Sequence, residues 1–178
     1  MTRAADVMTW VQATPFGAIE VVLGPDGLER VSMSDLHHDL WSERGAAHPP
    51  ADQKSRRVAG QFDAYFAGRR RNFDIDVVLA DSFTEFQRQV LLRLRDEVGY
   101  GETVTYGELA EIAGRPGAAR AVGSTMARNP VPFVIPCHRV VAANGIGGYG
   151  GGYGDAVALK RALLDFEAGV SSTLRSVR

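Results

Sequence analysis

Three prolines lie within seven residues in the stretch NPVPFVIP, at positions 129–136. Proline fixes its own φ, lacks a backbone N–H and restricts the residue before it, so this stretch cannot be helical. The prolines predict an extended, stiff path that leads directly to Cys137, the only cysteine of the chain. We therefore expect the single thiol to be held on a rigid segment and not on a mobile loop.

The first part of the chain has the pattern of a small sheet with one helix. Three short apolar runs, separated by the turn sequences TPFG and GPDG, predict antiparallel strands. These runs cover residues 7–12, 18–23 and 28–33. Residues 42–55 are polar and contain two prolines, which predicts a loop. Apolar spacing predicts a helix over 58–68, and partial alternation predicts a further strand over 73–79.

Helical patterns dominate the second half of the chain. Apolar residues at helical spacing predict a helix over 83–98. The tetrapeptide TYGE at 105–108 has the spacing of a capping box and predicts a helix that ends at Gly114. Pro116 suits the first turn of a further helix over 117–128. Two helices joined by a glycine-containing turn form a helix-turn-helix, although many all-helical cores contain such a pair.

We therefore predict an α+β chain with two domains. Residues 1–80 would form a scaffold domain with an antiparallel sheet and a helix. Residues 81–170 would form a mostly helical domain that contains the helix-turn-helix. The tail at 171–178 is polar and terminal, so we expect it to be disordered.

The distribution of charge suggests a nucleic acid partner, although the net charge of −1 does not. Residues 112–154 contain no Asp or Glu. Four arginines lie in this acid-free segment: Arg115, Arg120, Arg128 and Arg139. Such a segment would favour a phosphate backbone. The alternative is that arginine is the default cation of a chain with only two lysines, and charge alone does not separate these interpretations.

The predicted helix over 117–128 has few side chains on its surface. Its small residues include Ala118, Ala119, Ala121 and Gly123. Arg120 is the one long side chain among them. Such a helix can approach another surface closely, either a nucleic acid groove or a neighbouring helix. By itself, this pattern favours packing against a neighbouring helix.

The chain offers few metal ligands. One cysteine excludes an internal disulfide and a cysteine-rich zinc site. His37 and His38 are adjacent, but four histidines and one cysteine give no ligand set, so we predict no metal and no cofactor. The chain starts without the apolar core of a signal peptide, and no segment has the roughly 20 apolar residues that span a bilayer. We therefore predict a cytoplasmic protein with no membrane partner.

Cys137 needs activation if it is a nucleophile, because an ordinary thiol has a pKa of about 8.5. His138 is the adjacent base. Neighbouring side chains on an extended backbone point to opposite faces, so we expect a bridging water between the two. An acid that orients the imidazole must come from elsewhere in the chain. The alternative is that a lone buried cysteine is an inert small hydrophobe.

The residues around Cys137 are similar to one known active-site signature. The sequence RAVGSTMARNPVPFVIPCHRVVAANG at 120–145 resembles, nearly position for position, that of the O6-alkylguanine-DNA alkyltransferases (methylated-DNA–protein-cysteine methyltransferases). GETVTYGELAEIAGRPGAARAVG upstream and GYGGG and LKRALLDFE downstream extend the similarity over residues 83–168. The resemblance implies a ribonuclease H-like first domain and a winged-helix-like second domain.

The resemblance also implies the reaction and its catalytic residues. Cys137 would attack the alkyl carbon on guanine O6 in a single displacement and keep the group as a thioether. His138 would act as the base through water, with Glu167 as the acid that orients it. Tyr106 would donate a proton toward guanine N3. O4-alkylthymine is implied as a second substrate.

The implied partner is double-stranded DNA, bound in the minor groove with weak sequence preference by a monomeric protein. Arg120 would fill the gap left by a base that is rotated out of the duplex. Asn129 would be a hinge between the recognition helix and the cysteine segment. The other implied DNA contacts are Thr105, Tyr106, Ala119, Ala121 and Gly123. The implied substrate contacts are Met126, Asn129, Val140, Tyr149 and Gly150.

The chain departs from the family pattern after Tyr149. Seven residues, YGDAVAL at 153–159, separate a run of glycines from Lys160, and the family usually has a shorter stretch there. Gly150 stands where some members have a serine that can contact O6. The contacts of residues 149–155 therefore stay open.

Three other functions fit parts of the pattern. Alkyltransferase-like proteins bind the lesion without transfer, but they usually carry tryptophan in place of the cysteine. A cysteine hydrolase could use Cys137 and His138, and it would turn over many times. A plain helix-turn-helix DNA-binding protein would not need the thiol.

Overall fold

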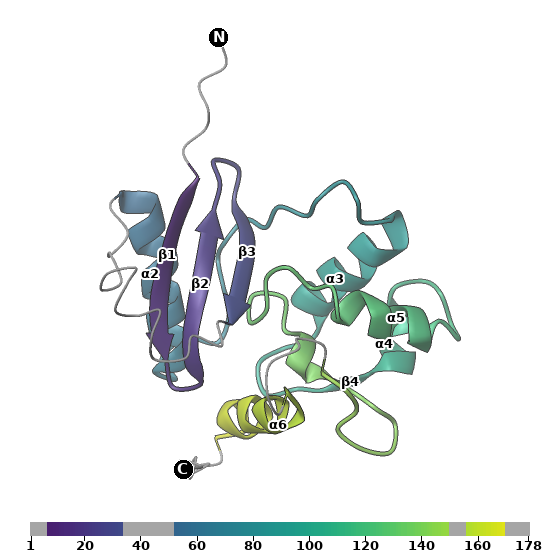
Figure 1. The fold of residues 1–178 in the computed structure, drawn as a ribbon. Helices are drawn as coiled ribbons and strands as arrows, with labels where there is room; N and C mark the ends of the chain where they lie inside the picture. Colours follow the sequence, from purple (N-terminus) through teal and green to yellow (C-terminus); the bar gives the residue numbers. More distant parts are fainter. Residues whose placement is uncertain (1–6, 34–51, 150–155, 170–178) are drawn as a thin grey trace. The chain divides into compact units, whose positions relative to one another are not determined.

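The computed structural model describes residues 7–33, 52–149 and 156–169. The chain divides into two units, Met1–Asp81 and Ser82–Arg178 (Figure 1). The predictions for Gly150 and for the tail at 171–178 lie outside the described residues.

A three-stranded antiparallel sheet forms the centre of the first unit (Figure 1). Its strands are β1 (Met8–Thr14), β2 (Gly17–Leu23) and β3 (Leu28–Met33), in the order β1-β2-β3. The β1–β2 turn is closed by the Thr14 hydroxyl, which donates to the Gly17 carbonyl at 2.6 Å. Ile19 and Val21 of the central strand are fully buried. The three predicted strands and their turns are confirmed.

Helix α2 spans Gln53–Phe66 and packs against β1. The Asp52 carboxylate accepts from the Ser55 backbone N–H at 2.9 Å, so the helix begins earlier than the sequence pattern predicted. The predicted loop over 42–55 is wrong at its end, because the aspartate cap starts a helix in a polar segment. The predicted apolar stripe is buried: it consists of Val58, Phe62, Tyr65 and Phe66.

The strand predicted over 73–79 is wrong. The segment meets the sheet through a single parallel bridge between Val77 and Leu28. One reason lies at Asp74, whose backbone N–H and carbonyl are both bonded by the Gln61 side chain, at 2.7 and 2.9 Å. A residue whose backbone groups are taken by a side chain cannot extend a strand ladder.

Three helices pack together in the second unit (Figure 1). They are α3 (Glu85–Glu97), α4 (Tyr106–Ile112) and α5 (Ala119–Met126). The predicted capping box of α4 is present: Thr105 accepts from the Glu108 N–H, and Glu108 accepts from the Thr105 N–H. A second capping box at Thr84 and Gln87 begins α3.

Pro116 lies before α5 and not in its first turn as predicted. The Ala118 N–H donates to the Arg115 carbonyl at 3.2 Å, and Gly117 has a φ of +83°. Proline followed by a glycine at positive φ is the sequence of a type II turn. The turn therefore uses both residues, and α5 begins only at Ala119.

The stretch 129–136 is not helical, as predicted, but it is a compact turn and not an extended segment. The Ile135 N–H donates to the Val131 carbonyl at 3.0 Å, and Phe133 has a φ of +72°. Asn129 holds the turn from inside: its Nδ2 donates to the Ile135 carbonyl at 2.7 Å, and its Oδ1 accepts from the Val131 N–H at 3.1 Å. The prolines exclude a helix but leave room for side-chain hydrogen bonds that fold the segment.

Three short elements follow this turn. A 3-10 turn, η1, spans Cys137–Arg139, and β5 (Val140–Val141) pairs in parallel with β4 (Val104–Thr105). Helix α6 spans Ala156–Glu167 and contacts η1. Four of the seven residues in the long stretch before Lys160 form the first turn of α6. Among the described residues, no helix has the length and apolarity needed to cross a membrane.

Candidate active site

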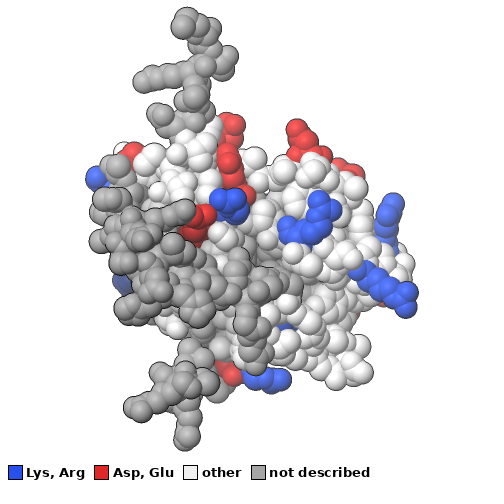
Figure 2. All heavy atoms as spheres, viewed as in Figure 1, with Lys and Arg blue, Asp and Glu red and all other residues white. Residues whose placement is uncertain are grey.

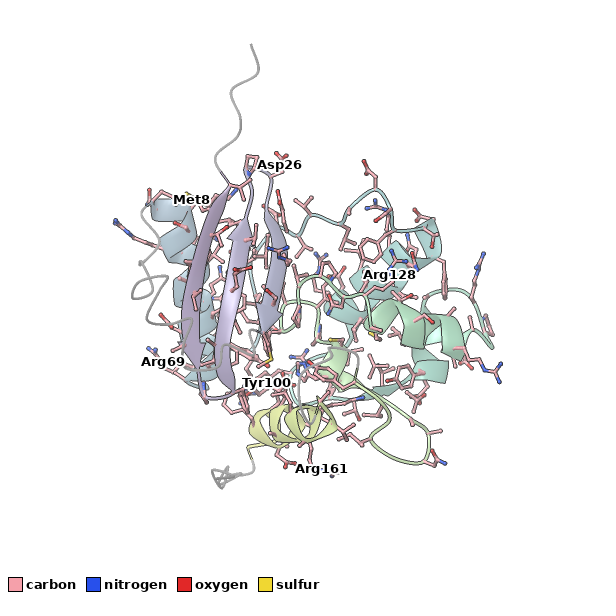
Figure 3. The ribbon with its side chains drawn as sticks, in the orientation of Figure 1. Met8, Asp26, Arg69, Tyr100, Arg128 and Arg161 are labelled. Atoms are coloured by element: carbon pink, nitrogen blue, oxygen red, sulfur yellow. The ribbon has the colours of Figure 1, made fainter. Side chains whose placement is uncertain are left out.

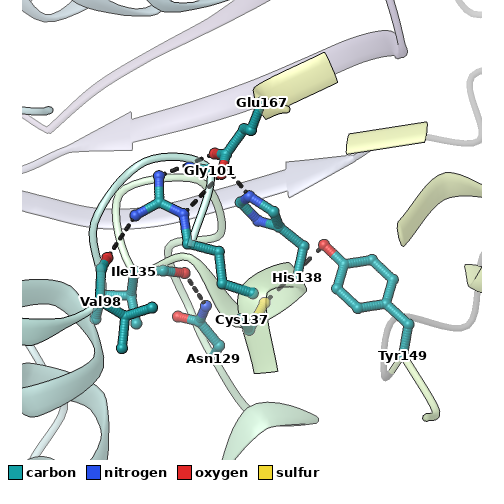
Figure 4. Close-up of polar contacts among 9 residues, drawn as sticks. Val98, Gly101, Asn129, Ile135, Cys137, His138, Tyr149 and Glu167 are labelled. Atoms are coloured by element: carbon teal, nitrogen blue, oxygen red, sulfur yellow. Dashed lines mark hydrogen bonds and ion pairs between the residues drawn. The ribbon is translucent and has the colours of Figure 1, made fainter. Parts of the chain in front are cut away.

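Cys137 lies at the start of η1 with only 6% of its surface exposed (Figure 4). Its Sγ is 4.0 Å from the Tyr149 hydroxyl oxygen. Burial raises the pKa of the thiol, and this rise is opposed by hydrogen bonds from Asn129 and Tyr149 and by the positive charge of Lys160. The thiol is therefore protonated at rest and needs a base to become a nucleophile.

His138 and Glu167 form a buried pair next to the thiol (Figure 4). His138 Nε2 lies 2.9 Å from Glu167 Oε1. His138 Nδ1 is buried and has no hydrogen-bond partner among the described residues. Burial lowers the pKa of His138 and outweighs the opposing effect of Glu167, so the imidazole is neutral at neutral pH. We expected an acid from elsewhere in the chain to bond this histidine, and Glu167 makes that contact.

Arg139 is a member of the site that the sequence reasoning missed. Its guanidinium donates to both oxygens of Glu167, at 2.8 and 2.9 Å, and to the Val98 carbonyl at 2.7 Å. Burial by itself would raise the pKa of Glu167, but hydrogen bonds from His138 and Arg139 hold it well below its ordinary value. Arg139 is only 4% exposed, so it is not available to a phosphate backbone. That part of the interpretation from the acid-free segment is wrong.

Lys160 is a second missed member. It is fully buried, and its Nζ donates to the carbonyls of Val140 at 2.6 Å and Gly148 at 2.9 Å. Burial lowers the pKa of Lys160 to about 8, and the nearby Cys137 opposes this shift. A lysine in a helical pattern gives no signal that separates such a buried cation from a solvated one.

Tyr106 is the first residue of α4 and connects three elements of the site. Its hydroxyl donates to the Gly148 carbonyl at 3.0 Å, the same oxygen that Lys160 bonds. The Lys160 Nζ lies 5.7 Å from the centre of its ring. A Cβ on Gly147 would lie 3.1 Å from the ring, so the glycine allows the close approach of this loop. Burial raises the pKa of Tyr106, and the nearby Cys137 adds a smaller rise.

The exposed face of α5 is formed by small residues and one arginine. Arg120, Ala121 and Ser124 are exposed, whereas Val122, Thr125 and Met126 are buried. Close packing against another helix therefore occurs on one face of α5 only. Met126, predicted as a substrate contact, is 5% exposed and belongs to the buried face.

Two further arginines of the acid-free segment are exposed: Arg115 in the turn between α4 and α5, and Arg128 after the end of α5. Arg115 lies 4.9 Å from the ring centre of Phe86. Arg128, which is labelled in Figure 3, lies 5.2 Å from the ring centre of Phe83. Figure 2 shows separate blue side chains on a mostly white surface at the right of the view, where α4 and α5 lie. Such isolated cations favour a polyanion.

Comparisons with known proteins identify the family of this chain. A family model described as 6-O-methylguanine DNA methyltransferase, DNA binding domain, matches residues 85–169. A methylated-DNA–protein-cysteine methyltransferase from Methanosarcina acetivorans is 46% identical over 160 residues, which cover 86% of this chain and 94% of the relative. The chain belongs to the methylated-DNA–protein-cysteine methyltransferase family.

Crystal structures of the family support the fold over nearly the whole chain. The chain is similar to Mycobacterium tuberculosis O6-methylguanine methyltransferase with a TM-score of 0.74 and 33% identity, covering 94% of this chain and 96% of that one. It is also similar to a Mycobacterium tuberculosis OGT in complex with DNA, with a TM-score of 0.73 and 34% identity, covering 92% and 94% of the two chains. The family match includes η1 and α6, which carry the residues around Cys137.

The described part of this methyltransferase-family chain contains no group of three or more His, Cys, Asp or Glu side chains that could hold a metal ion. His37 and His38 lie outside the described residues. The charged groups around Cys137 are instead paired with one another or with backbone carbonyls.

Proposed function

We propose that the protein repairs DNA by moving an alkyl group from guanine O6, or from thymine O4, to the sulfur of its own Cys137. The observation that carries this proposal is the buried set of Cys137, His138 and Glu167. A neutral imidazole next to a protonated thiol is the arrangement needed for general base activation.

The reaction we propose is a single displacement. His138 Nδ1 takes the thiol proton through a bridging water, and the thiolate attacks the alkyl carbon. The carbon–oxygen bond breaks, its electron pair goes to the guanine, and Tyr106 donates a proton toward N3. The proton that His138 accepted then replaces, through water, the one that Tyr106 gave up, so the products are dealkylated guanine and an S-alkyl cysteine. No second thiol is present to release the group, and a thioether is not cleaved by disulfide exchange, so each molecule reacts once.

Tyr106 must change its hydrogen bond for this step. At rest its hydroxyl donates to the Gly148 carbonyl, so the incoming base would replace that acceptor. The raised pKa of Tyr106 keeps the phenol protonated until negative charge develops on the leaving guanine. This supports a role as proton donor and not as base.

The partner we propose is double-stranded DNA, contacted from the minor groove by α5. A base inside a duplex cannot reach a buried thiol and has to be rotated out, and Arg120 would fill its place. The exposed Ala and Ser side chains beside Arg120 support close approach without base-specific contacts. Thr105, Ala119 and Gly123 belong to the same proposed contact surface.

We further propose that the protein acts as a monomer in the cytoplasm. Residues 81–170 would carry the reaction, with a winged-helix-like arrangement of helix-turn-helix and short strands. Residues 1–80 would be a ribonuclease H-like scaffold. Asn129 would hold the cysteine turn, and the Val140 carbonyl and Tyr149 would contact the base.

The test is to incubate the protein with duplex DNA that carries a labelled O6-methylguanine. We expect one label per molecule on the peptide that contains Cys137, measured by intact mass and peptide mapping. Cys137→Ser should keep its affinity for DNA and lose transfer. Absence of label from Cys137 would contradict the proposal, and repeated turnover of a model ester would favour a hydrolase instead.

A further inference from the structure

The Glu167 carboxylate accepts hydrogen bonds from groups other than His138. The Arg139 guanidinium spans both oxygens, with Nε donating to Oε2 at 2.8 Å and Nη2 to Oε1 at 2.9 Å. The Gly101 backbone N–H donates to Oε2 at 3.1 Å. His138 bonds only Oε1. The planar fork of an arginine matched to a carboxylate is a strong and directional pair.

The balance of buried charge depends on this pair. Arg139, Glu167 and His138 are at most 5% exposed, and the positive charges of Arg139 and the buried Lys160 both disfavour a proton on His138. Arg139 already balances the charge of Glu167. A proton added to His138 would therefore place an uncompensated positive charge in the interior, which is costly. Without Arg139, protonation of His138 would be the least unfavourable way to balance the negative charge of Glu167.

The tautomer of His138 follows from the same contacts. Because an ionised carboxylate only accepts hydrogen bonds, His138 Nε2 carries the proton that points to Glu167. Nδ1 then has a free lone pair and is buried without a partner among the described residues. This nitrogen can accept a proton only while the ring is neutral.

We propose that Arg139 is a positioning residue for alkyl transfer. By holding Glu167 as a fixed, charged acceptor, it keeps His138 neutral, with Nδ1 ready to take the Cys137 proton. The inference rests on the proposed function. The competing interpretation is that Arg139 only ties α6 to the Val98 carbonyl and has no influence on His138.

The first experiment measures the reaction with the free base O6-benzylguanine by intact mass between pH 5.5 and 9. We expect Arg139→Met to react about tenfold slower than wild type at pH 7 and to recover toward pH 9, since each unit of rise in the His138 pKa lowers the neutral fraction about tenfold. Arg139→Lys keeps the charge but not the planar fork, so its profile should stay closer to that of wild type than the Arg139→Met profile does.

Loss of structure cannot imitate this pattern, because it would not be reversed by high pH. A wild-type pH profile in a folded Arg139→Met protein would overturn the inference.

The second experiment does not depend on transfer activity. Nitrogen-15 NMR of the imidazole rings, with His138 assigned by the spectrum of His138→Gln, should show His138 as the neutral Nε2–H form at pH 7 in wild type. The ring should be doubly protonated in Arg139→Met. An imidazolium in the wild-type protein at pH 7 overturns the inference even if Arg139→Met does not fold. Wild type that shows the neutral ring but does not alkylate Cys137 would instead reject the proposed function.

Discussion

At the scale of single residues, the site consists of buried charged side chains whose partners are distant in sequence. Glu167 is 29 positions from His138, and Lys160 is 20 positions from the Val140 carbonyl. The resemblance to a family pointed to Glu167, but nothing in the sequence indicated that Arg139 and Lys160 are buried. An arginine or lysine looks the same in the sequence whether its side chain is exposed to solvent or paired with a carboxylate. Only its tertiary contacts reveal its role.

Lys160 should set the reactivity of the thiol. Its charge lowers the pKa of Cys137, so Lys160→Met should raise that pKa and slow alkylation by iodoacetamide at pH 7.5. A rise of one unit would leave about tenfold less thiolate. Since Cys137 is the only cysteine, the mass gain of the whole protein reports its rate. Arg161→Gln removes an exposed cation from the same helix and should have no effect; equal slowing in both variants would contradict the prediction.

At the scale of elements, α5 presents a nearly bare face with one long cation. Arg120→Ala should weaken binding to duplex DNA and reduce the slope of log affinity against log salt by about 1, because one phosphate contact or inserted cation is lost. Reaction with free O6-benzylguanine should stay within about twofold of wild type, since α5 lies outside the chemical step. Fluorescence anisotropy at several salt concentrations and intact mass measure the two effects.

The control for Arg120 is Arg93→Ala on α3, because the Arg93 guanidinium already pairs with Glu97. It should leave the salt slope unchanged. If Arg120→Ala slows the free-base reaction as much as the DNA reaction, its role is structural and the proposed DNA contact is wrong.

The capping box of α4 fixes the position of Tyr106, which follows the cap directly. Thr105→Ala should lower the free energy of unfolding by about 1 kcal/mol, as measured by urea denaturation, because the Glu108 N–H loses its acceptor. Thr105→Ser keeps the hydroxyl and should lose much less. Equal losses in the two variants would show that the methyl group, and not the cap, supports the helix.

At the scale of the whole molecule, stability should decline in acid through the His138–Glu167–Arg139 cluster. Both His138 and Glu167 have a lower pKa in the folded state than in the unfolded chain. Each group therefore contributes stability at a pH above its pKa in the unfolded chain, and that stability is lost as the pH falls. The urea midpoint, followed by circular dichroism, should begin to fall below about pH 6.5 and fall more steeply below about pH 4.5.

Glu167→Gln tests the source of this acid sensitivity. It should be less stable than wild type at pH 7, because Arg139 loses its charged partner, and the difference should shrink as the pH falls below the Glu167 range. A difference that stays constant from pH 7 to pH 3 would assign the acid sensitivity to other carboxylates, such as Asp52 and Glu108, whose pKa values are also lowered by their helix caps.

The sequence predicted those elements that depend on local rules. The three strands of the sheet and the capping box at Thr105 follow from neighbours along the chain, and they are confirmed. The errors occurred where a distant or side-chain contact replaced the local one. Gln61 takes the backbone groups of Asp74 and prevents a strand, and Asn129 folds the proline segment that was expected to be extended.

The sequence by itself determined that a single thiol would follow a proline-bound segment next to a histidine, and which family this pattern resembles. Only the tertiary structure decided the electrostatic state of the site. In the folded chain, Arg139 is buried and donates hydrogen bonds to Glu167. Lys160 is buried beside the thiol and donates to two backbone carbonyls. The reason is physical: the energy of a charge depends on its burial and on the partners within hydrogen-bond distance, and in this chain those partners come together only when α6 packs against η1.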